Sequence, residues 1–367
     1  MFDDIRPYRN DEVTDIIESL ISEKEFQSSV ASVAMPKMYR RFPKLGRFLA
    51  KLYLRYQQKH LNSIEKIQQE VSKHLNSLIN NSANGFTFSG IEKVDPNKPS
   101  LFISNHRDIV LDVALVNLAL HRSNRPTVEA AVGDNLLAKK WVADLMRINK
   151  SFIVKRSEET KRAMLKASKE LSAYIHHALT DNKQDIWIAQ REGRAKDGLD
   201  VTNPALISML LLNKKKEQSI GEYLAEINII PVSISYEFDP CDSDKAIELA
   251  TRETTGGYEK GDEEDLRSIT QGMMGFKGKI HLAFTDPING EFENSKEIAN
   301  AIDQQIISEY KLYDSNLTAF AKLNNQDVDH GVFQLLSERM QDLTSAQQKW
   351  LLTMYANPVL AKKALVS

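Results

Sequence analysis

The stretch LFISNHRDIVLD, residues 101–112, has the pattern of a short strand, a polar turn and the start of a helix. The strand candidate is Leu101–Ser104, and the apolar spacing that follows predicts a helix over Asp108–Leu120. His106 falls between the two, where the backbone can hold a partly exposed side chain in a fixed position. We therefore expect a strand–turn–helix unit, a building block of layered α/β folds.

The same alternation of short apolar runs and longer amphipathic runs continues on both sides of this stretch. Further strands are predicted at Phe86–Ser89, Thr127–Ala131, Phe152–Val154, Asp185–Ala189, Ile227–Tyr236 and Lys279–Phe284. Helices are predicted between them at Asn135–Met146, Glu158–Leu179, Pro204–Leu212 and Asp262–Met274. Strands separated by helices predict an α/β fold with a mixed, mostly parallel sheet flanked by helices.

Helical sequence flanks this alternating region, so we predict three parts. They are an N-terminal helical region (1–85), an α/β domain (86–290) and a C-terminal helical region (291–367). The helix candidates of the two flanks are Asp11–Val33, Pro43 to about Ile79, Ser295–Leu323, Val332–Leu343 and Ala346–Tyr355.

Composition narrows the class of protein. The chain is 42% hydrophobic and 27% charged, as globular proteins are, and 48 basic against 50 acidic residues argue against a nucleic-acid-binding polycation. Cys241 is the single cysteine, which excludes a disulfide framework. The acidic start lacks a secretory pattern, and the longest apolar stretch, Ile109–Leu120, is too short to span a bilayer. We expect a soluble or membrane-surface protein of a reducing compartment.

Residues 35–60 form a basic amphipathic segment. Apolar residues recur every three or four positions, and no Asp or Glu interrupts the cations. The cations are Lys37, Arg40, Arg41, Lys44, Arg47, Lys51, Arg55 and Lys59. Such a helix can lie in the headgroup layer of an anionic membrane, gaining about 1 kcal/mol per basic residue. Alternatively, its apolar face packs on the core of its own protein and its cations are solvated.

The turn around His106 carries two carboxylates with different positions. Asp108 suits the helix N-cap, and Asp112 lies about one helical turn further, from where it could reach back to the imidazole. A histidine held by a carboxylate is the arrangement that activates a neutral hydroxyl. A capped helix with a surface histidine is the structural alternative.

Three further blocks place polar residues after or within strands. NKSFIVKR, residues 149–156, ends in two cations, and QREGR, residues 190–194, follows another strand with two arginines around a glycine. IIPVSISYE, residues 229–237, is a strand with a proline near its start. Arginine forks match phosphate, and ligands of α/β folds bind beyond the carboxyl ends of the strands. Each block alone is also compatible with a solvated surface turn.

Together and in this order the four blocks resemble the glycerophospholipid acyltransferase superfamily, which includes glycerol-3-phosphate and 1-acylglycerol-3-phosphate acyltransferases. The resemblance covers roughly residues 86–290 and implies that His106 is the catalytic base. It departs from the family pattern in the first block, where five residues rather than four separate His106 from Asp112. The partner of His106 is therefore Asp112, which we prefer, or Asp108.

The same resemblance implies a phosphate site made by the second and third blocks. Arg156, Arg191 and Arg194 would hold the phosphate of the acceptor, Glu192 would orient these arginines, and Gly193 would allow a tight loop. The third block lacks the residue that the family has between its glycine and its last arginine. The family role of that arginine therefore passes to Arg194 or Arg191.

The implied reaction moves a fatty acyl group from acyl-CoA or acyl carrier protein to the hydroxyl of glycerol-3-phosphate or 1-acylglycerol-3-phosphate. No metal or redox cofactor is expected. Lipid substrates favour the membrane interpretation of residues 35–60 and a cytoplasmic protein bound peripherally to the membrane. The alternatives are an acyltransferase acting on another lysolipid or lipid alcohol, and a non-catalytic lipid-binding relative.

Overall fold

The computed structural model describes residues 2–137, 139–261, 264–328 and 330–366. The chain divides into two compact units. Unit 1 comprises Met1–His74 and Thr127–Tyr174, and unit 2 comprises Leu75–Pro126 and Ile175–Ser367. Two of the three boundaries fall within helices α5 (Ile64–Ser82) and α8 (Lys161–Thr180), and the third lies in the loop at Pro126 and Thr127. The predicted division into three domains, which follows composition along the chain, stays a prediction.

A mostly parallel sheet organises unit 2. Its strands are β1 (Phe86–Ser89), β2 (Leu101–Ser104), β5 (Ile186–Ala189), β6 (Ile229–Tyr236) and β7 (Ile280–Phe284). They lie in the order β1-β7-β6-β2-β5, and only β6 and β7 are antiparallel. Every residue of β2 and β6 is buried, as expected for central strands covered on both faces. The predicted α/β class with a mixed, mostly parallel sheet is confirmed.

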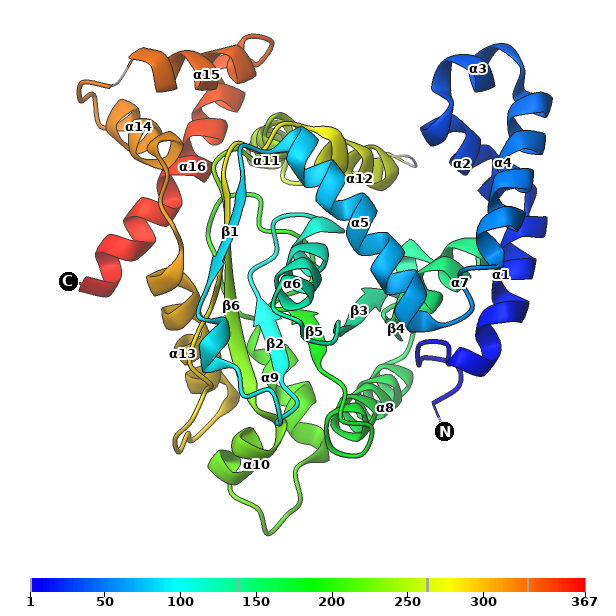
Figure 1. The fold of residues 1–367 in the computed structure, drawn as a ribbon. Coiled ribbons are helices and arrows are strands. Elements are labelled where there is room, and N and C mark those ends of the chain that lie inside the picture. Colours follow the sequence, from blue (N-terminus) through cyan, green and yellow to red (C-terminus); the bar gives the residue numbers. More distant parts are fainter. Residues whose placement is uncertain (1, 138, 262–263, 329, 367) are drawn as a thin grey trace. The chain divides into compact units, whose positions relative to one another are not determined.

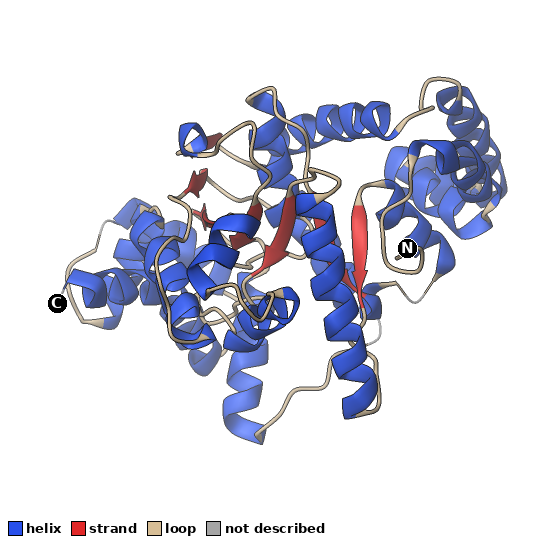
Figure 2. Cartoon of the chain, turned by 90° about the horizontal axis from the view of Figure 1, so that it is seen from below, coloured by secondary structure: helices blue, strands red, loops and turns tan. Residues whose placement is uncertain are grey.

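Helices cover both sides of these strands. Figure 1 shows α13 on one side of β6 and β2 and α6 on the other, and Figure 2 shows how short the strands are beside the helices. The helices of unit 2 are α6 (Leu111–Arg122), α9 (Pro204–Leu210), α10 (Ile220–Ile227), α11 (Asp242–Thr255), α12 (Glu264–Met274), α13 (Ser295–Glu309), α14 (Asp314–Leu323), α15 (His330–Met340) and α16 (Ser345–Val366). Short 3₁₀ turns lie at η2 (Ile91–Lys93) and η4 (Leu211–Asn213).

Unit 1 is mainly helical and holds one parallel strand pair. Its elements are η1 (Asn10–Glu12), α1 (Val13–Ser22), α2 (Lys24–Ala34), α3 (Pro36–Arg41), α4 (Pro43–Gln58), β3 (Glu129–Gly133), η3 (Asp134–Leu136), α7 (Lys140–Ile148) and β4 (Ser151–Val154). Strands β3 and β4 pair with Ala130 opposite Ser151. Its core joins α1, α5 and α7 through Val13, Ile17, Ile67 and Ile148. Among the described residues no helix is long and apolar enough to cross a membrane.

The strand predictions agree with the structure to within two residues at each end, but several helix predictions were too long. The helix predicted over Asp11–Val33 breaks at Glu23, whose extended backbone lets its carboxylate accept the Glu25 amide and start α2. The one predicted from Pro43 to Ile79 breaks after Gln58, and Ile64 restarts as α5 with its amide bonded to the Asn10 side chain. Side-chain caps thus interrupt a helical hydrophobic pattern that continues across the break.

Other differences concern helix starts. The helices α10 and α11 were not predicted, and the helix predicted over Ser295–Leu323 is divided into α13 and α14. Helix α7 begins at Lys140, five residues after its predicted start, with Ala138 outside the described residues. The first residues of the helix predicted from Asp262 also lie outside them, and its described part begins at Glu264.

Candidate active site

His106 lies in the turn between β2 and α6 and is held by one ring nitrogen. Its Nδ1 is 2.9 Å from Oδ2 of Asp112, and its side chain is 15% exposed while Asp112 is fully buried. The indole of Trp187 on β5 meets the imidazole edge-on at 6.2 Å between ring centroids. With Nδ1 donating to Asp112, the tautomer places a lone pair on Nε2, the nitrogen that can accept a proton.

Asp112 is bonded by four donors. Its Oδ2 accepts from His106 and from the backbone amides of Arg107 (2.6 Å) and Asp108 (2.9 Å), and its Oδ1 accepts from the Tyr236 hydroxyl (2.9 Å). Burial, followed by the charge of Asp112, raises the pKa of Tyr236 well above its ordinary value, so Tyr236 stays a donor. Four fixed donors leave this carboxylate little freedom to turn away from the imidazole.

Asp108 caps the start of α6 and does not contact the imidazole. Its Oδ1 accepts from the amides of Val110 (2.9 Å) and Leu111 (2.8 Å). This tight turn delays the regular helix to Leu111, three residues later than predicted. The extra residue between His106 and Asp112 is therefore absorbed before the helix, and Asp112 remains in its first turn.

The other carboxyl oxygen of Asp108 faces helix α12. A Cβ built on Gly272 would lie 2.0 Å from Oδ2 of Asp108, so only glycine fits there. Burial, followed by the negative charge of Asp112, raises the pKa of Asp108. Asp108 is thus a buried structural acid that joins the His106 turn to α12.

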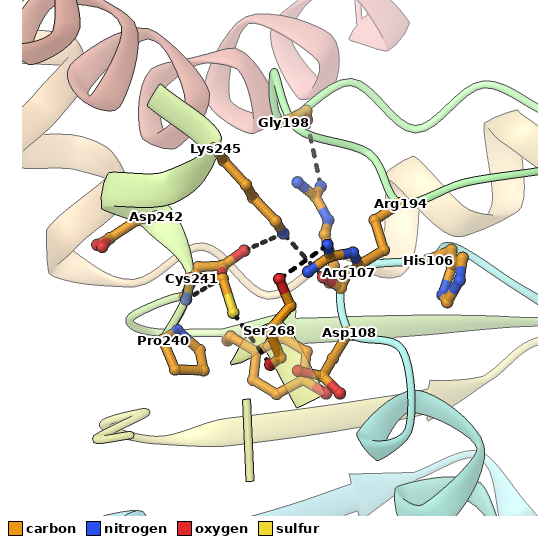
Figure 3. Close-up of polar contacts among 12 residues, drawn as sticks. His106, Arg107, Asp108, Arg194, Gly198, Pro240, Cys241, Asp242, Lys245 and Ser268 are labelled. Atoms are coloured by element: carbon orange, nitrogen blue, oxygen red, sulfur yellow. Dashed lines mark hydrogen bonds and ion pairs between the residues drawn. The ribbon is translucent and has the colours of Figure 1, made fainter. Parts of the chain in front are cut away.

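The third block reaches the same place from β5. Gly193 has φ +73°, in the left-handed region that favours glycine, and the amide of Ala195 donates to the carbonyl of His106 at 2.7 Å. The side chain of Arg194 donates from Nη2 to Ser268 Oγ on α12 at 3.3 Å (Figure 3). His106 and Arg194, 88 positions apart in sequence, therefore lie in adjoining turns of unit 2.

The remaining residues of the predicted phosphate site are placed differently. Arg191 is partly exposed and Glu192 is exposed in the same loop as Arg194. Arg156 belongs to unit 1, where it follows β4 and its amide donates to Asp134 Oδ2 at 3.1 Å. The structure thus brings the first and third blocks together in unit 2, and the second block lies in unit 1.

The fourth block, β6, fixes the residue before His106. The side chain of Asn105 accepts from the Ile234 amide at 2.8 Å and donates to the Ile234 carbonyl at 3.0 Å. Sequence reasoning missed this contact, and it missed Tyr236 as a donor to Asp112. Tyr236 was part of the fourth block, but nothing in its spacing indicates which strand faces which carboxylate.

The basic amphipathic segment forms α3 and α4 of unit 1, and several of its large apolar residues are exposed. Helix α4 packs against α2, with Gly46 and Ala50 buried, and its Leu54 packs on the core of unit 1. The apolar side chains that are 47–63% exposed are Phe42, Leu45, Phe48, Leu52, Tyr53 and Tyr56. The segment therefore contacts its own protein on one side and keeps a set of large apolar residues exposed beside the cations.

Comparisons with known proteins bear on the family resemblance. No curated protein matches the chain. A solved structure, the 1-acyl-sn-glycerophosphate (LPA) acyltransferase PlsC from Thermotoga maritima, is similar at 13% identity and a TM-score of 0.39, over 77% of this chain and 96% of that chain. The model of the acyltransferase family matches residues 85–235, which contain the first three blocks and the fourth as far as Ser235. This family match confirms the resemblance carried by the four blocks.

Proposed function

We propose that the protein transfers a fatty acyl group from a thioester donor to the hydroxyl of glycerol-3-phosphate or 1-acylglycerol-3-phosphate. The observation that carries this proposal is the contact of the buried Asp112 with Nδ1 of His106. Within the described residues, this contact leaves Nε2 of His106 without a hydrogen-bond partner. The acyltransferase family match supports the class of reaction. The phosphorylated acceptor is supported by the arginine loop beside His106.

His106 acts as the general base and then as the general acid. Its Nε2 removes the proton of the acceptor hydroxyl while the oxygen attacks the thioester carbonyl carbon. The tetrahedral oxyanion collapses and expels the thiolate, which takes the same proton from the imidazolium. Asp112 stabilises the imidazolium between the two transfers. Such a base contributes about 10²–10⁴-fold to the rate.

Carboxylates already engage four backbone amides at the start of α6. The amides of Arg107 and Asp108 already donate to Asp112, and those of Val110 and Leu111 donate to Asp108. These four amides are therefore not available to the oxyanion.

Arg194 and Arg191 hold the acceptor phosphate, and the phosphate role of Arg156, which belongs to unit 1, stays a prediction. Charge-assisted bonds of this kind contribute roughly 1.5–3 kcal/mol each. Glu192 orients the arginines by offering them a common carboxylate, and Gly193 gives the loop its tight turn. The reaction needs no metal or redox cofactor.

The protein reaches its lipid substrates by binding an anionic membrane surface through residues 35–60. The exposed apolar residues of α4 favour this role, because they remain available although Gly46, Ala50 and Leu54 already make the contacts of α4 with its own unit. Amphipathic helices with cations beside an exposed apolar stripe lie in the interface of anionic bilayers. Peripheral membrane association follows from this proposal.

The test is an acceptor screen with purified protein and with the variant His106→Ala. We expect transfer from labelled acyl-CoA or acyl carrier protein to glycerol-3-phosphate or lysophosphatidic acid, and a loss of about 10²–10⁴-fold in the variant. His121→Ala, an exposed histidine at the far end of α6, is the matched control and should keep full activity. Transfer only to lysophospholipids or neutral alcohols would show that the acceptor belongs to another class. Unchanged activity in His106→Ala would refute the mechanism.

A further inference from the structure

The loop after β5 is tied to the His106 turn by a side chain as well as by a backbone bond. Arg107, the residue after His106, donates from Nη2 to the carbonyl of Gly198 at 3.2 Å and to Oδ2 of Asp200 at 2.5 Å. Figure 3 shows Arg107 reaching away from the turn toward Gly198, while Arg194 points to Ser268. Arg107 therefore contacts the far end of the loop whose near end carries Arg194.

This ion pair is buried at both ends. Arg107 is 6% exposed and Asp200 is 7% exposed, and the guanidinium lies over the ring of Tyr310 at 5.4 Å from its centroid. Asp200 Oδ2 also accepts from Asn105 Nδ2 at 3.2 Å. Separating two buried charges is costly, so the loop cannot move from the turn without breaking the pair.

The backbone of Arg107 contributes to the other half of the site. Its amide donates to the carboxylate of Asp112, and its carbonyl accepts from Nζ of Lys245 at 2.8 Å. The main chain of Arg107 therefore contacts Asp112, the carboxylate that orients His106. The side chain of Arg107 contacts the loop that carries Arg194. Movement at one contact is transmitted to the other.

The geometry of the pair favours a positional role over a gain in stability. An arginine and a carboxylate bind most strongly through two parallel bonds. Here, within the described residues, Arg107 Nε and Asp200 Oδ1 are buried without a hydrogen-bond partner. Instead, Nη2 of Arg107 donates to both Asp200 and the Gly198 carbonyl. This shared donor fixes two points of the loop, but it makes each hydrogen bond weaker than a paired contact would be.

We propose that Arg107 and Asp200 are positioning residues that set the place of the phosphate-binding Arg194 relative to the catalytic His106. Neither residue touches a substrate in this proposal, and both act through the loop. The inference rests on the proposed function, because it assigns the loop to the acceptor phosphate. It predicts a selective effect on the acceptor, since the donor thioester does not depend on the loop.

The test replaces both charges together. The paired variant Arg107→Gln with Asp200→Asn keeps hydrogen-bonding groups and leaves no unpaired charge in the interior. We expect the KM for glycerol-3-phosphate, and its Kd measured by calorimetry without donor, to rise between about ten- and a hundredfold. The KM for the thioester should stay unchanged. Arg194→Ala gives the scale of a direct loss of phosphate binding.

The matched control is a second ion pair of unit 2, with a buried carboxylate and a half-buried arginine, that makes no hydrogen bond to the loop within the described residues. Arg339 and Asp242 join α15 to α11, and Arg339→Gln with Asp242→Asn should change stability without changing either KM. If the first paired variant does not fold, Arg107→Lys keeps the charge but cannot reach both partners. Its Kd for glycerol-3-phosphate should then rise by a smaller factor.

Two results would overturn the proposal. One is a paired or Lys variant with unchanged affinity for glycerol-3-phosphate, and the other is an equal rise in both KM values, which indicates general damage. The phosphate role of the loop itself is refuted if the wild-type protein does not bind glycerol-3-phosphate. It is also refuted if the wild type and Arg194→Ala bind glycerol-3-phosphate with the same affinity. That result identifies a failure of the proposed function rather than of the coupling.

Discussion

The turn around His106 and helix α4 both carry charged residues that were identified from the sequence. The two regions differ in how far these charges are buried. In the turn, Asp112 and Asp108 are buried and accept six hydrogen bonds from named donors. On α4 the cations are exposed or half-buried, and large apolar residues such as Phe48, Leu52 and Tyr56 are exposed. Buried charges fix the geometry of a reaction, whereas exposed charges are available to a partner of opposite sign.

The largest expected effect is on the rate of acyl transfer, and it tests the buried charges of the His106 turn. Asp112→Asn keeps the shape of the side chain but offers an amide to His106, which favours the wrong tautomer of the imidazole. We expect acyl transfer to fall about 10³-fold, with vesicle binding unchanged. Single-turnover rates measure the effect. Wild-type rates in this variant would mean that the carboxylate has only a structural role.

A smaller effect tests the exposed side. Replacing Lys44, Arg47, Lys51 and Arg55 with glutamine removes four cations from α4. At about 1 kcal/mol per basic residue, and with some loss to screening, we expect binding to phosphatidylserine vesicles to weaken about 10²-fold or more. Vesicle sedimentation at low and high salt measures this effect.

The control for the α4 variant removes the same number of exposed charges from unit 2. The four lysines to replace with glutamine are Lys98, Lys183, Lys216 and Lys296. This control should sediment with vesicles as the wild type does. Equal binding by the α4 variant and the control would remove the membrane role of residues 35–60. Transfer to a water-soluble acceptor should stay unchanged in both, because neither set includes a residue of the proposed catalytic or phosphate site.

The smallest expected effect concerns stability and a buried carboxylate beside the loop. Oδ1 of Asp303 on α13 accepts from the amide of Thr202 at 2.7 Å, and burial raises the pKa of Asp303 from 3.8 to about 6. The folded protein thus binds this proton more tightly than the unfolded chain. Stability from Asp303 is full below the unfolded pKa, decreases as the pH rises toward 6, and is lost above it.

Asp303→Asn removes this charge and retains an acceptor for Thr202. We expect the variant to be more stable than the wild type by about 1–2 kcal/mol near pH 7, with no gain near pH 4, after allowing for partial solvent exposure. Urea unfolding at the two pH values gives the difference. A constant difference at both would show that the charge is not its cause.

Local pattern was a good guide to the strands and a poorer guide to the helices. The sequence placed β1 and β2 with both ends correct, because β1 alternates half-buried phenylalanines with exposed polar residues and β2 is a short run of four buried residues. The break at Glu23 and the late start of α6 at Leu111 were missed, since each depends on a side-chain acceptor capturing particular amides. The preference for Asp112 over Asp108 as the partner of His106 agrees with the contact in the structure.

The sequence by itself determined the α/β class, the four ordered blocks and the residue types that a base and a phosphate site need. Only the tertiary structure decided that His106 and Arg194 adjoin, that Tyr236 donates to Asp112, and that Arg107 reaches Asp200. The reason is physical. Periodicity records which face of an element is apolar, but contacts between distant residues depend on strand order, and each strand's order in the sheet is set by packing of the whole unit.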